Sequence, residues 1–364
     1  MIAPTHGRSG LGRVEALDGV RGLAVLLVVA SHLQPYLLPP SELGRRVGAA
    51  LRGGWIGVDL FFVLSGFLIT TLLLEERTSH GRVQLGAFYG RRAVRLLPAL
   101  YVVLAAYLSY TLVFGLAWPP AVRTVECALL YVNNWQTAWF PSTVARPIAH
   151  LWSLSIEEQF YLVWPAILIL FVAPRRRWTG AAVIGGAIVS LVAYRAYLGM
   201  PGGDWLRPFV GTDTRADALL AGALLSWLRV HGLLPRRGAG AIAWAGTAGL
   251  VALFCYADPT SPFWPRGGFT LIAAGVVAIL LGVLDGSWAG VRFFELAPLR
   301  LLGRVSYGLY LWHHFVFWAI IDHPGSLPLL ARLAFALGLT AALTAASWLL
   351  VERRAQRLRR RFGR

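Results

Sequence analysis

Long apolar runs separated by short polar segments dominate the hydrophobic pattern of this chain. Most of the runs hold roughly 17–23 residues, close to the ~20 that a helix needs to cross the hydrocarbon core of a bilayer. The pattern therefore predicts an all-α fold, a polytopic integral membrane bundle of about ten transmembrane helices, plus one short or re-entrant outer segment. The expected spans lie at residues 17–36, 55–75, 93–116, 153–173, 179–198, 214–230, 240–257, 268–285, 301–321 and 328–350.

The stretch 124–138 is apolar but does not fit a membrane span. It is interrupted by four polar side chains, Glu126, Asn133, Asn134 and Gln136. If this stretch crossed the bilayer, every later cluster of arginines would change sides, beginning with the triplet at 175–177. We therefore expect it to enter and leave on the outer side, so that Pro119 and Ser142 face the same compartment.

The charged residues are also typical of a membrane protein. Only 14% of the 364 residues are charged and 57% are hydrophobic, whereas soluble domains carry about 25% charged residues. The net charge is +17, and all 34 basic residues are arginines. They lie in small clusters between the apolar runs, which argues against a nucleic-acid partner and favours cytoplasmic loops enriched in positive charge. The arginines that fall in outer loops are Arg45, Arg46, Arg52, Arg123, Arg146, Arg207 and Arg266.

The same pattern predicts the domain organisation. We expect a cytoplasmic N-terminal tail at 1–16, one transmembrane domain at 17–351 and a basic cytoplasmic C-terminal tail at 352–364. This arrangement places the protein in the bacterial inner (cytoplasmic) membrane as a multi-pass protein, with both termini in the cytoplasm. The two cysteines, Cys127 and Cys255, both lie in apolar settings and predict no disulfide framework.

The first apolar run carries two ionisable residues, Arg21 and His32. A cleaved signal peptide is an alternative interpretation of this run, but His32 stands where cleavage needs a small residue. Eleven residues at 100° each bring Arg21 and His32 to one helix face, roughly 16 Å apart along the axis. Polar groups in a span are costly and indicate function. The competing interpretation is that His32 is an interfacial histidine, since Pro35 and Tyr36 follow closely.

Two further sets of charges stand in or near the next spans. Asp59 begins the second span at the expected depth of His32, where a carboxylate can fix the tautomer of an imidazole; alternatively it complements the dipole of its own helix. Arg92 and Arg95 share a helix face and can bind phosphate groups. Their alternative role is to anchor the cytoplasmic end of the helix.

Adjacent carboxylates, Glu157 and Glu158, precede another apolar run. Neighbouring helix residues point about 100° apart, so both cannot face the interior of the bundle. We expect Glu157 to face inward toward His32, and Glu158 to reach the outer surface or a loop arginine. The alternative is a plain helix start, with Ser153 or Ser155 as the cap and the glutamates in the first turn.

Six stretches carry a family resemblance because they occur together and in order: LDGVRGLAVLLVVASH, GWIGVDLFFVLSGFLIT, FYGRRAVRLLPALY, HLWSLSIEEQFYLVWP, RADALLAGALL and VSYGLYLWHH. As a set they resemble the acyltransferase 3 family of integral membrane O-acyltransferases. Members move short acyl groups from acyl-CoA to hydroxyls of carbohydrates or glycosylated molecules. Some carry an extra hydrolase-like outer domain, which we do not expect after Arg364.

The resemblance assigns roles to individual residues. It implies that His32 and Glu157 are catalytic and that Arg21, Arg92 and Arg95 bind the acyl-CoA donor. Asp59 is a further catalytic candidate because of its expected depth beside His32. Substrate-binding roles are implied for five more residues: Arg215, Asp217, Ser306, Tyr307 and His313.

The predicted function is transfer of an acyl group, with acetyl-CoA as the expected donor substrate and no permanently bound cofactor, to a carbohydrate or glycosylated acceptor. His32 would act as a general base or carry the acyl group itself. We expect no metal site, because His313 and His314 are adjacent and should point apart. The alternatives are acylation of a cytosolic natural product such as a macrolide sugar, and a proton-coupled transporter or flippase. The acceptor, the acyl length, the membrane face that receives the acyl group and the oligomeric state stay open.

Overall fold

The computed structural model describes residues 14–37, 48, 51–172, 175–199, 204–235, 237–258, 260–322 and 328–358, without the side chains of 34–37 and 321–322. All regular structure in these residues is helical, as predicted. The longer helices are α1 (Glu15–Leu37), α3 (Gly57–His80), α4 (Leu85–Val113), α7 (Trp152–Ile167), α8 (Arg177–Leu198), α10 (Thr212–Val230), α11 (Ala239–Tyr256), α12 (Phe269–Asp285), α14 (Ala297–Asp322) and α15 (Leu329–Ala346). The short ones are η1 (Arg52–Ile56), α5 (Trp118–Leu129), α6 (Asn133–Trp139), η2 (Pro141–Thr143), η3 (Arg146–Leu151), η4 (Leu168–Val172), α9 (Leu206–Val210), η5 (Trp264–Gly268), α13 (Val291–Phe294), η6 (Ser347–Glu352) and α16 (Arg353–Leu358).

The fold is that of a multi-pass membrane protein. Within the described residues, eight helical segments are long and apolar enough to cross a bilayer. The two other expected spans correspond to α10 and α14, which are long but carry more polar side chains. The all-α membrane bundle is therefore confirmed, and the count of ten crossings stays a prediction. The tails at 1–13 and 359–364 lie outside the described residues.

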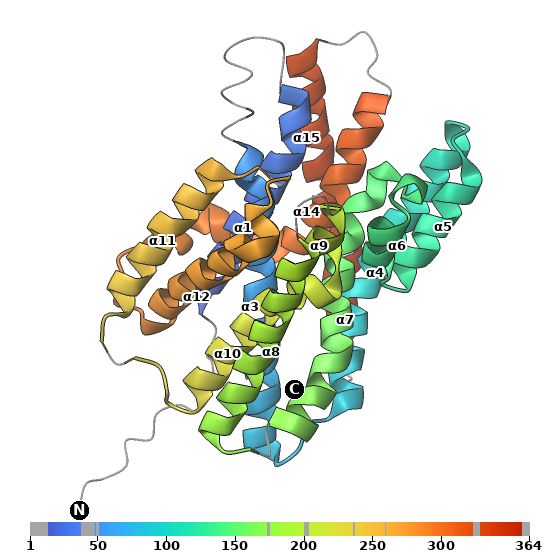
Figure 1. Ribbon diagram of the computed structural model, residues 1–364. Helices are drawn as coiled ribbons and strands as arrows, with labels where there is room; N and C mark the ends of the chain where they lie inside the picture. Colours follow the sequence, from blue (N-terminus) through green and yellow to red (C-terminus); the bar gives the residue numbers. More distant parts are fainter. Residues whose placement is uncertain are drawn as a thin grey trace, which may run out of the picture.

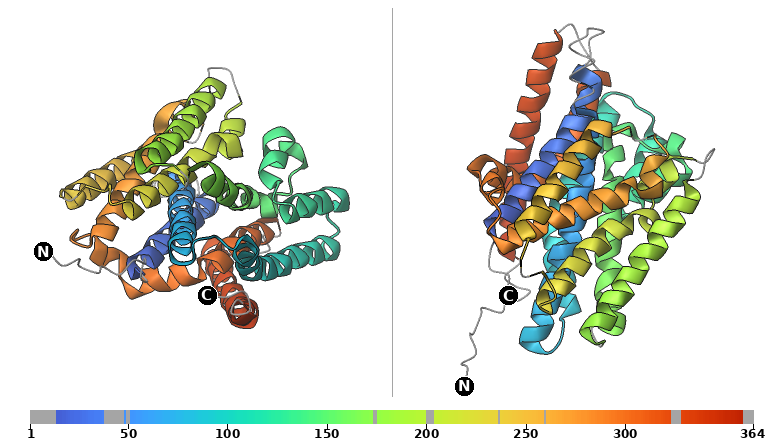
Figure 2. Two further views of the ribbon diagram at one scale, coloured as in Figure 1. Left: turned by 90° about the horizontal axis from the view of Figure 1, so that it is seen from below. Right: turned by 60° about the vertical axis from the view of Figure 1, so that its left-hand side comes forward.

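Helix α3 lies in the middle of the bundle when the molecule is seen along its long axis (Figure 2). Glycines let it approach α10 closely, since a Cβ at Gly66 would stand 1.8 Å from the Leu219 carbonyl oxygen and one at Gly222 1.9 Å from that of Val63. Helices α1 and α14 meet in the same way, with Gly22 against the Leu299 backbone. Small residues are the usual means of close helix packing in membranes.

Helices α5 and α6 form a short hairpin beside α4, on the opposite side of the molecule from α11 and α12 (Figure 1). They have 12 and 7 residues, so each rises less than ~20 Å, whereas the hydrocarbon core is about 30 Å thick. The hairpin turns at Tyr131, whose φ of 54° is the only positive value outside glycine in the described chain. Gln159 of α7 donates a hydrogen bond of 2.6 Å to its carbonyl oxygen. The stretch 124–138 is thus split between two helices that are too short to span.

Candidate active site

A cavity of about 290 Å³, here called the arginine pocket, lies between α1, α3, α4, α7 and α14. Its charged lining residues are three arginines and three glutamates: Arg21, Arg92, Arg95, Glu75, Glu157 and Glu158. Ser65, Tyr161 and Tyr307 add hydroxyl groups. The structure therefore brings together all three arginines that were predicted to bind the donor, although they come from two different helices.

Arg92 is held firmly on one wall of this pocket. Its Nη2 forms an ion pair of 3.1 Å with Glu158 Oε1, and its guanidinium lies 3.4 Å from the centre of the Tyr161 ring. Its Nε has no hydrogen-bond partner although it is buried. The expectation that Glu158 points to the outer surface or a loop arginine is therefore wrong, because the turn of α7 directs Glu158 toward Arg92 of α4.

Glu157 lines the same pocket from the adjacent position. It accepts a hydrogen bond of 3.1 Å from Ser65 Oγ of α3. No contact between Glu157 and His32 occurs among the described residues, so the expected pairing of these two is not formed. The alternative of a capped helix start is also wrong: α7 begins at Trp152 with no side-chain cap and no acidic residue in its first turn. Glu157 thus lies more than one turn inside the helix.

Four histidines form a second group, here called the histidine cluster: His32, His150, His313 and His314. The ring centre of His32 lies 5.1 Å from that of His313 and 4.5 Å from that of His314. His150, in η3, stacks on His314 at 4.8 Å. His313 and His314 are adjacent on α14 with their ring centres 6.1 Å apart, and the ring of His32 contacts both because it lies between them.

The hydrogen bonds of the cluster determine the tautomers of its neutral rings. His313 Nδ1 lies 3.1 Å from the Leu309 carbonyl oxygen, which can only accept, so Nδ1 carries the proton. His313 Nε2 is then an acceptor, and His32 Nδ1 must donate across the 2.9 Å that separates them. The proton of neutral His32 is therefore on Nδ1. Its Nε2, which makes no hydrogen bond within the described chain, keeps a lone pair.

The other two histidines are fixed in the same manner. His314 Nδ1 lies 3.1 Å from the Pro147 carbonyl oxygen, and its Nε2 accepts from Trp318 Nε1 at 3.2 Å. His150 Nε2 donates to the Tyr310 carbonyl oxygen at 2.9 Å. The described residues include no group of three or more histidine, cysteine or acidic side chains placed to hold a metal ion.

Three helices connect the two sites. Helix α1 carries Arg21 in the pocket and His32 in the cluster, and α14 carries Tyr307 in the pocket and His313 in the cluster. The third is α7, which carries Glu157 in the pocket. It follows directly after η3, which carries His150 in the cluster. The rise from Arg21 to His32 is roughly 16 Å.

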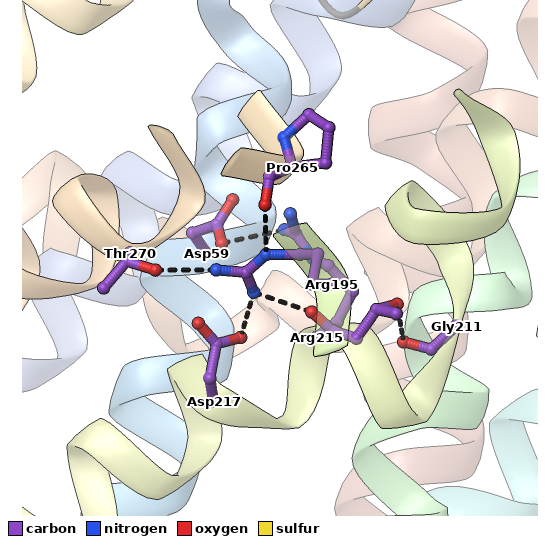
Figure 3. A network of polar contacts seen from close by, with 8 residues as sticks. Asp59, Arg195, Gly211, Arg215, Asp217, Pro265 and Thr270 are labelled. Atoms are coloured by element: carbon purple, nitrogen blue, oxygen red, sulfur yellow. Dashed lines mark hydrogen bonds and ion pairs between the residues drawn. The ribbon is translucent and has the colours of Figure 1, made fainter. Parts of the chain in front are cut away.

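Asp59 has a different partner from the one expected. It pairs with Arg215 at 2.8 Å, both side chains being buried, and contacts no histidine in the described residues. Asp217 pairs with Arg195 at 2.6 Å, and Figure 3 shows how Arg195 also donates to carbonyl and hydroxyl oxygens around it. Asp59, Arg215 and Asp217 are thus engaged with protein groups that join α3, α8, α10 and α12. Asp59 Oδ2 and the Nε and Nη1 of Arg215 nevertheless have no hydrogen-bond partner although they are buried, so the roles predicted for Asp59, Arg215 and Asp217 stay predictions.

Two predicted residues of α14 lie apart from the histidine cluster. Tyr307 donates to the Leu96 carbonyl oxygen at 2.8 Å and lines the arginine pocket. Ser306 is buried and its hydroxyl has no hydrogen-bond partner. The structure therefore places Tyr307 against the arginine pocket, and the role predicted for Ser306 stays a prediction.

The sequence analysis missed two residues, Arg195 and His150. Arg195 is a charge inside an apolar run, which is by itself a signal of function or of a buried ion pair. His150 precedes the helix start and has no helical periodicity to align it with His32. Only the packing of η3 against α14 brings it into the cluster.

The chain belongs to the acyltransferase family whose profile, described as an acyltransferase domain (acyltransferase 3), matches residues 14–352. Its similarity to curated proteins points the same way. It is 35% identical over 325 residues to the peptidoglycan O-acetyltransferase OatA of Listeria monocytogenes, covering 83% of this chain and 49% of the relative.

The O-acetyltransferase OatA of Staphylococcus aureus is 32% identical over 320 residues, with 83% of this chain and 50% of the relative covered. The chain thus spans about half the length of the curated relatives it matches. No solved structure matches it.

Proposed function

We propose that this chain transfers an acyl group, acetyl in the first instance, from acyl-CoA to a hydroxyl of a carbohydrate. The single observation that carries the proposal is the free lone pair on His32 Nε2, which follows from the hydrogen bond of its Nδ1 to His313. A fixed imidazole with one free nitrogen is suited to take a proton or to attack a carbonyl carbon. The membership of the chain in an acyltransferase family supports the reaction class.

The arginine pocket is the proposed donor site. Arg21 Nε and Arg92 Nε are buried donors without an acceptor, and unpaired buried N–H groups cost free energy unless a ligand satisfies them. The phosphates of acyl-CoA offer such acceptors. Glu158 and Tyr161 hold the Arg92 guanidinium in place before the donor arrives. Ordering the side chain in advance lowers the entropic cost of binding.

The histidine cluster is the proposed place of reaction. The helices α1, α7 and α14 lead from the pocket to the cluster, so an extended thioester arm can follow them from the arginines toward His32. Glu157 lies on this route with its carboxylate held by Ser65. There it balances the charge of the arginines and contacts the arm of the donor as it passes.

The proposal also includes an orientation in the membrane and a class of acceptor. The pocket opens to the cytoplasm, where acyl-CoA is available, both termini are cytoplasmic, and the protein resides in the inner membrane. Relatives named for O-acetylation of peptidoglycan support a cell-envelope carbohydrate as acceptor.

The proposal is tested with the purified full chain in lipid vesicles. It should move radiolabel from acetyl-CoA to a cell-envelope glycan fraction as an ester that mild alkali releases. The proposal would be contradicted if, after correction for hydrolysis of acetyl-CoA, no label reached any of several kinds of glycan fraction. A vesicle preparation without protein is the control.

A further inference from the structure

His150 has a ring nitrogen that nothing in the mechanism above uses. Its side chain is only 3% exposed. Its Nε2 donates to the Tyr310 carbonyl oxygen, so in the neutral ring Nδ1 holds a lone pair. That Nδ1 is buried and has no hydrogen-bond partner. A buried acceptor left without a donor opposes folding, and a hydroxyl of a bound ligand is a donor that can satisfy it.

Tyr310 holds His150 in place through two hydrogen bonds, one to the ring and one to the backbone. Tyr310 accepts from the ring through its backbone, and its own hydroxyl donates to the His150 carbonyl oxygen. Ser153 Oγ shares a hydrogen bond of 2.7 Å with the same tyrosine hydroxyl. The ring also stacks on His314 and lies at 74° to the ring of His32, with 6.3 Å between the ring centres of His150 and His32. Such fixed rings are expected where a side chain must meet a reacting group.

The histidine cluster therefore offers two free lone pairs, on His32 Nε2 and on His150 Nδ1. An acceptor hydroxyl has a single proton, so only one of the two nitrogens can remove it. The other nitrogen is left for a different task. In acyl transfer that task is attack on the acyl carbon.

We propose that His150 is a further catalytic residue, which takes the proton of the acceptor hydroxyl while His32 carries the acyl group. This inference rests on the function proposed above. It divides the reaction into two half-reactions and assigns each lone pair to one of them.

In the first half-reaction His32 Nε2 attacks the thioester carbon. A C–N bond forms, the C–S bond breaks, and CoA leaves as the thiolate. The Nδ1 proton of His32 moves along the 2.9 Å hydrogen bond to His313 Nε2. The acylated ring is then neutral and His313 is the cation that balances the thiolate.

In the second half-reaction the acceptor oxygen attacks the acyl carbon as its proton passes to His150 Nδ1. A C–O bond forms, the C–N bond breaks, and His32 recovers its proton from His313. His150 then gives its proton to solvent, and the CoA thiolate takes a proton from solvent. The sum is an ester and free CoA.

The half-reactions can be measured separately in the full chain reconstituted in lipid vesicles. Exchange of radiolabelled CoA into acetyl-CoA without any acceptor reports the first, and ester formation reports both. His150→Gln is the test variant, because its amide can still donate to the Tyr310 carbonyl but has no ring nitrogen at the Nδ1 position. We expect it to keep the exchange rate within a few-fold and to lose transfer by about 10²–10⁴-fold, the range for loss of a general base.

Two variants complete the experiment. His32→Gln should lose both exchange and transfer. His80→Gln is the matched control, because His80 is exposed at the end of α3 and bonds only to the Glu76 carbonyl oxygen of its own helix, and it should retain both. Normal transfer in His150→Gln, or loss of exchange together with transfer, would overturn the assignment to His150.

Transfer without any exchange in the unmodified protein would overturn the acyl-histidine step, and with it the division between the two histidines. If the unmodified protein transferred no label from acetyl-CoA at all, the proposed function would fail, and this inference would fail with it.

Discussion

At the scale of single residues, the account depends on His313 holding His32 in one tautomer. His313 in turn is held by the Leu309 carbonyl oxygen. A carboxylate would hold a histidine more strongly, but Asp59 is occupied by Arg215. The hydrogen bonds from His32 to His313 and from His313 to the Leu309 carbonyl oxygen thus fix the tautomer of His32, a role that was expected for Asp59.

Substitution of His313 tests whether these two hydrogen bonds matter for transfer. His313→Gln places an amide oxygen near the position of Nε2, where it can still accept a hydrogen bond from His32 Nδ1 but cannot take up its proton, so we expect transfer to fall, though less than in a variant that lacks any acceptor. His313→Leu removes the acceptor and frees the His32 tautomer, and transfer should fall by at least about tenfold, toward the 10²–10⁴ range of a lost general base. Initial rates with saturating acetyl-CoA check this. Equal rates in the two variants would show that His313 does not act through this hydrogen bond.

Arg92 provides a second test, on donor binding. Arg92→Ala removes a charge-assisted contact to phosphate worth about 1.5–3 kcal/mol, so the dissociation constant for acetyl-CoA should rise roughly 10- to 150-fold. Arg91→Ala is the matched control, because Arg91 pairs with Glu76 at 3.3 Å and does not line the arginine pocket. Calorimetric titration of the purified variants checks both. Similar constants for Arg92→Ala and Arg91→Ala would mean that Arg92 only anchors its helix.

At the scale of helices, the contact between α3 and α10 positions Ser65 and the residues around it. Gly222→Ala would place a methyl group 1.9 Å from the Val63 carbonyl oxygen and 2.7 Å from the Phe67 amide nitrogen. Overpacking of this kind costs about 1–3 kcal/mol. Gly249→Ala in α11 is the control, since its Cβ would meet nothing within 4 Å.

Thermal unfolding in detergent measures the difference between these two glycine variants. Gly222→Ala should melt several degrees below the unmodified protein, and Gly249→Ala at the same temperature or slightly higher. If both melted together, the close contact seen at Gly222 would not limit stability.

The α5–α6 hairpin makes a prediction about topology. Single cysteines at Pro119 and Ser142, in a background with Cys127 and Cys255 replaced by alanine, should both react with an impermeant maleimide added to intact cells. The reason is that neither helix of the hairpin is long enough to cross the bilayer. Reaction at only one of the two sites would place a crossing between them.

At the scale of the whole molecule, the fold class and most residues of the two sites could be predicted from the sequence, but His150 and the pairing of the side chains could not. Span lengths predict a membrane bundle, and helical spacing puts Arg21 and His32 on one face. Periodicity says nothing of partners on other helices. His32 and His313 are 281 residues apart in the sequence, and Glu158 and Arg92 are 66 residues apart.

The two wrong pairings, of Asp59 and of Glu157 with His32, have a common physical cause. Both predictions depend on the expected depth of these carboxylates in the membrane. Depth does not determine the direction in which a side chain points once the glycine contacts bring α3 and α10 together. Because Arg195 and Arg215 enter from α8 and α10, the carboxylates of α3 and α10 pair with them instead.

The central claim is that His32 performs chemistry and does not bind the donor. The most direct measurement compares acetyl-CoA binding and acyl transfer by purified His32→Ala with those of the unmodified protein. His32 lies roughly 16 Å along α1 from Arg21, so the account predicts a dissociation constant within a few-fold of normal and a transfer rate lowered by about 10²–10⁴-fold. A variant that kept more than about a tenth of the normal rate would contradict the claim.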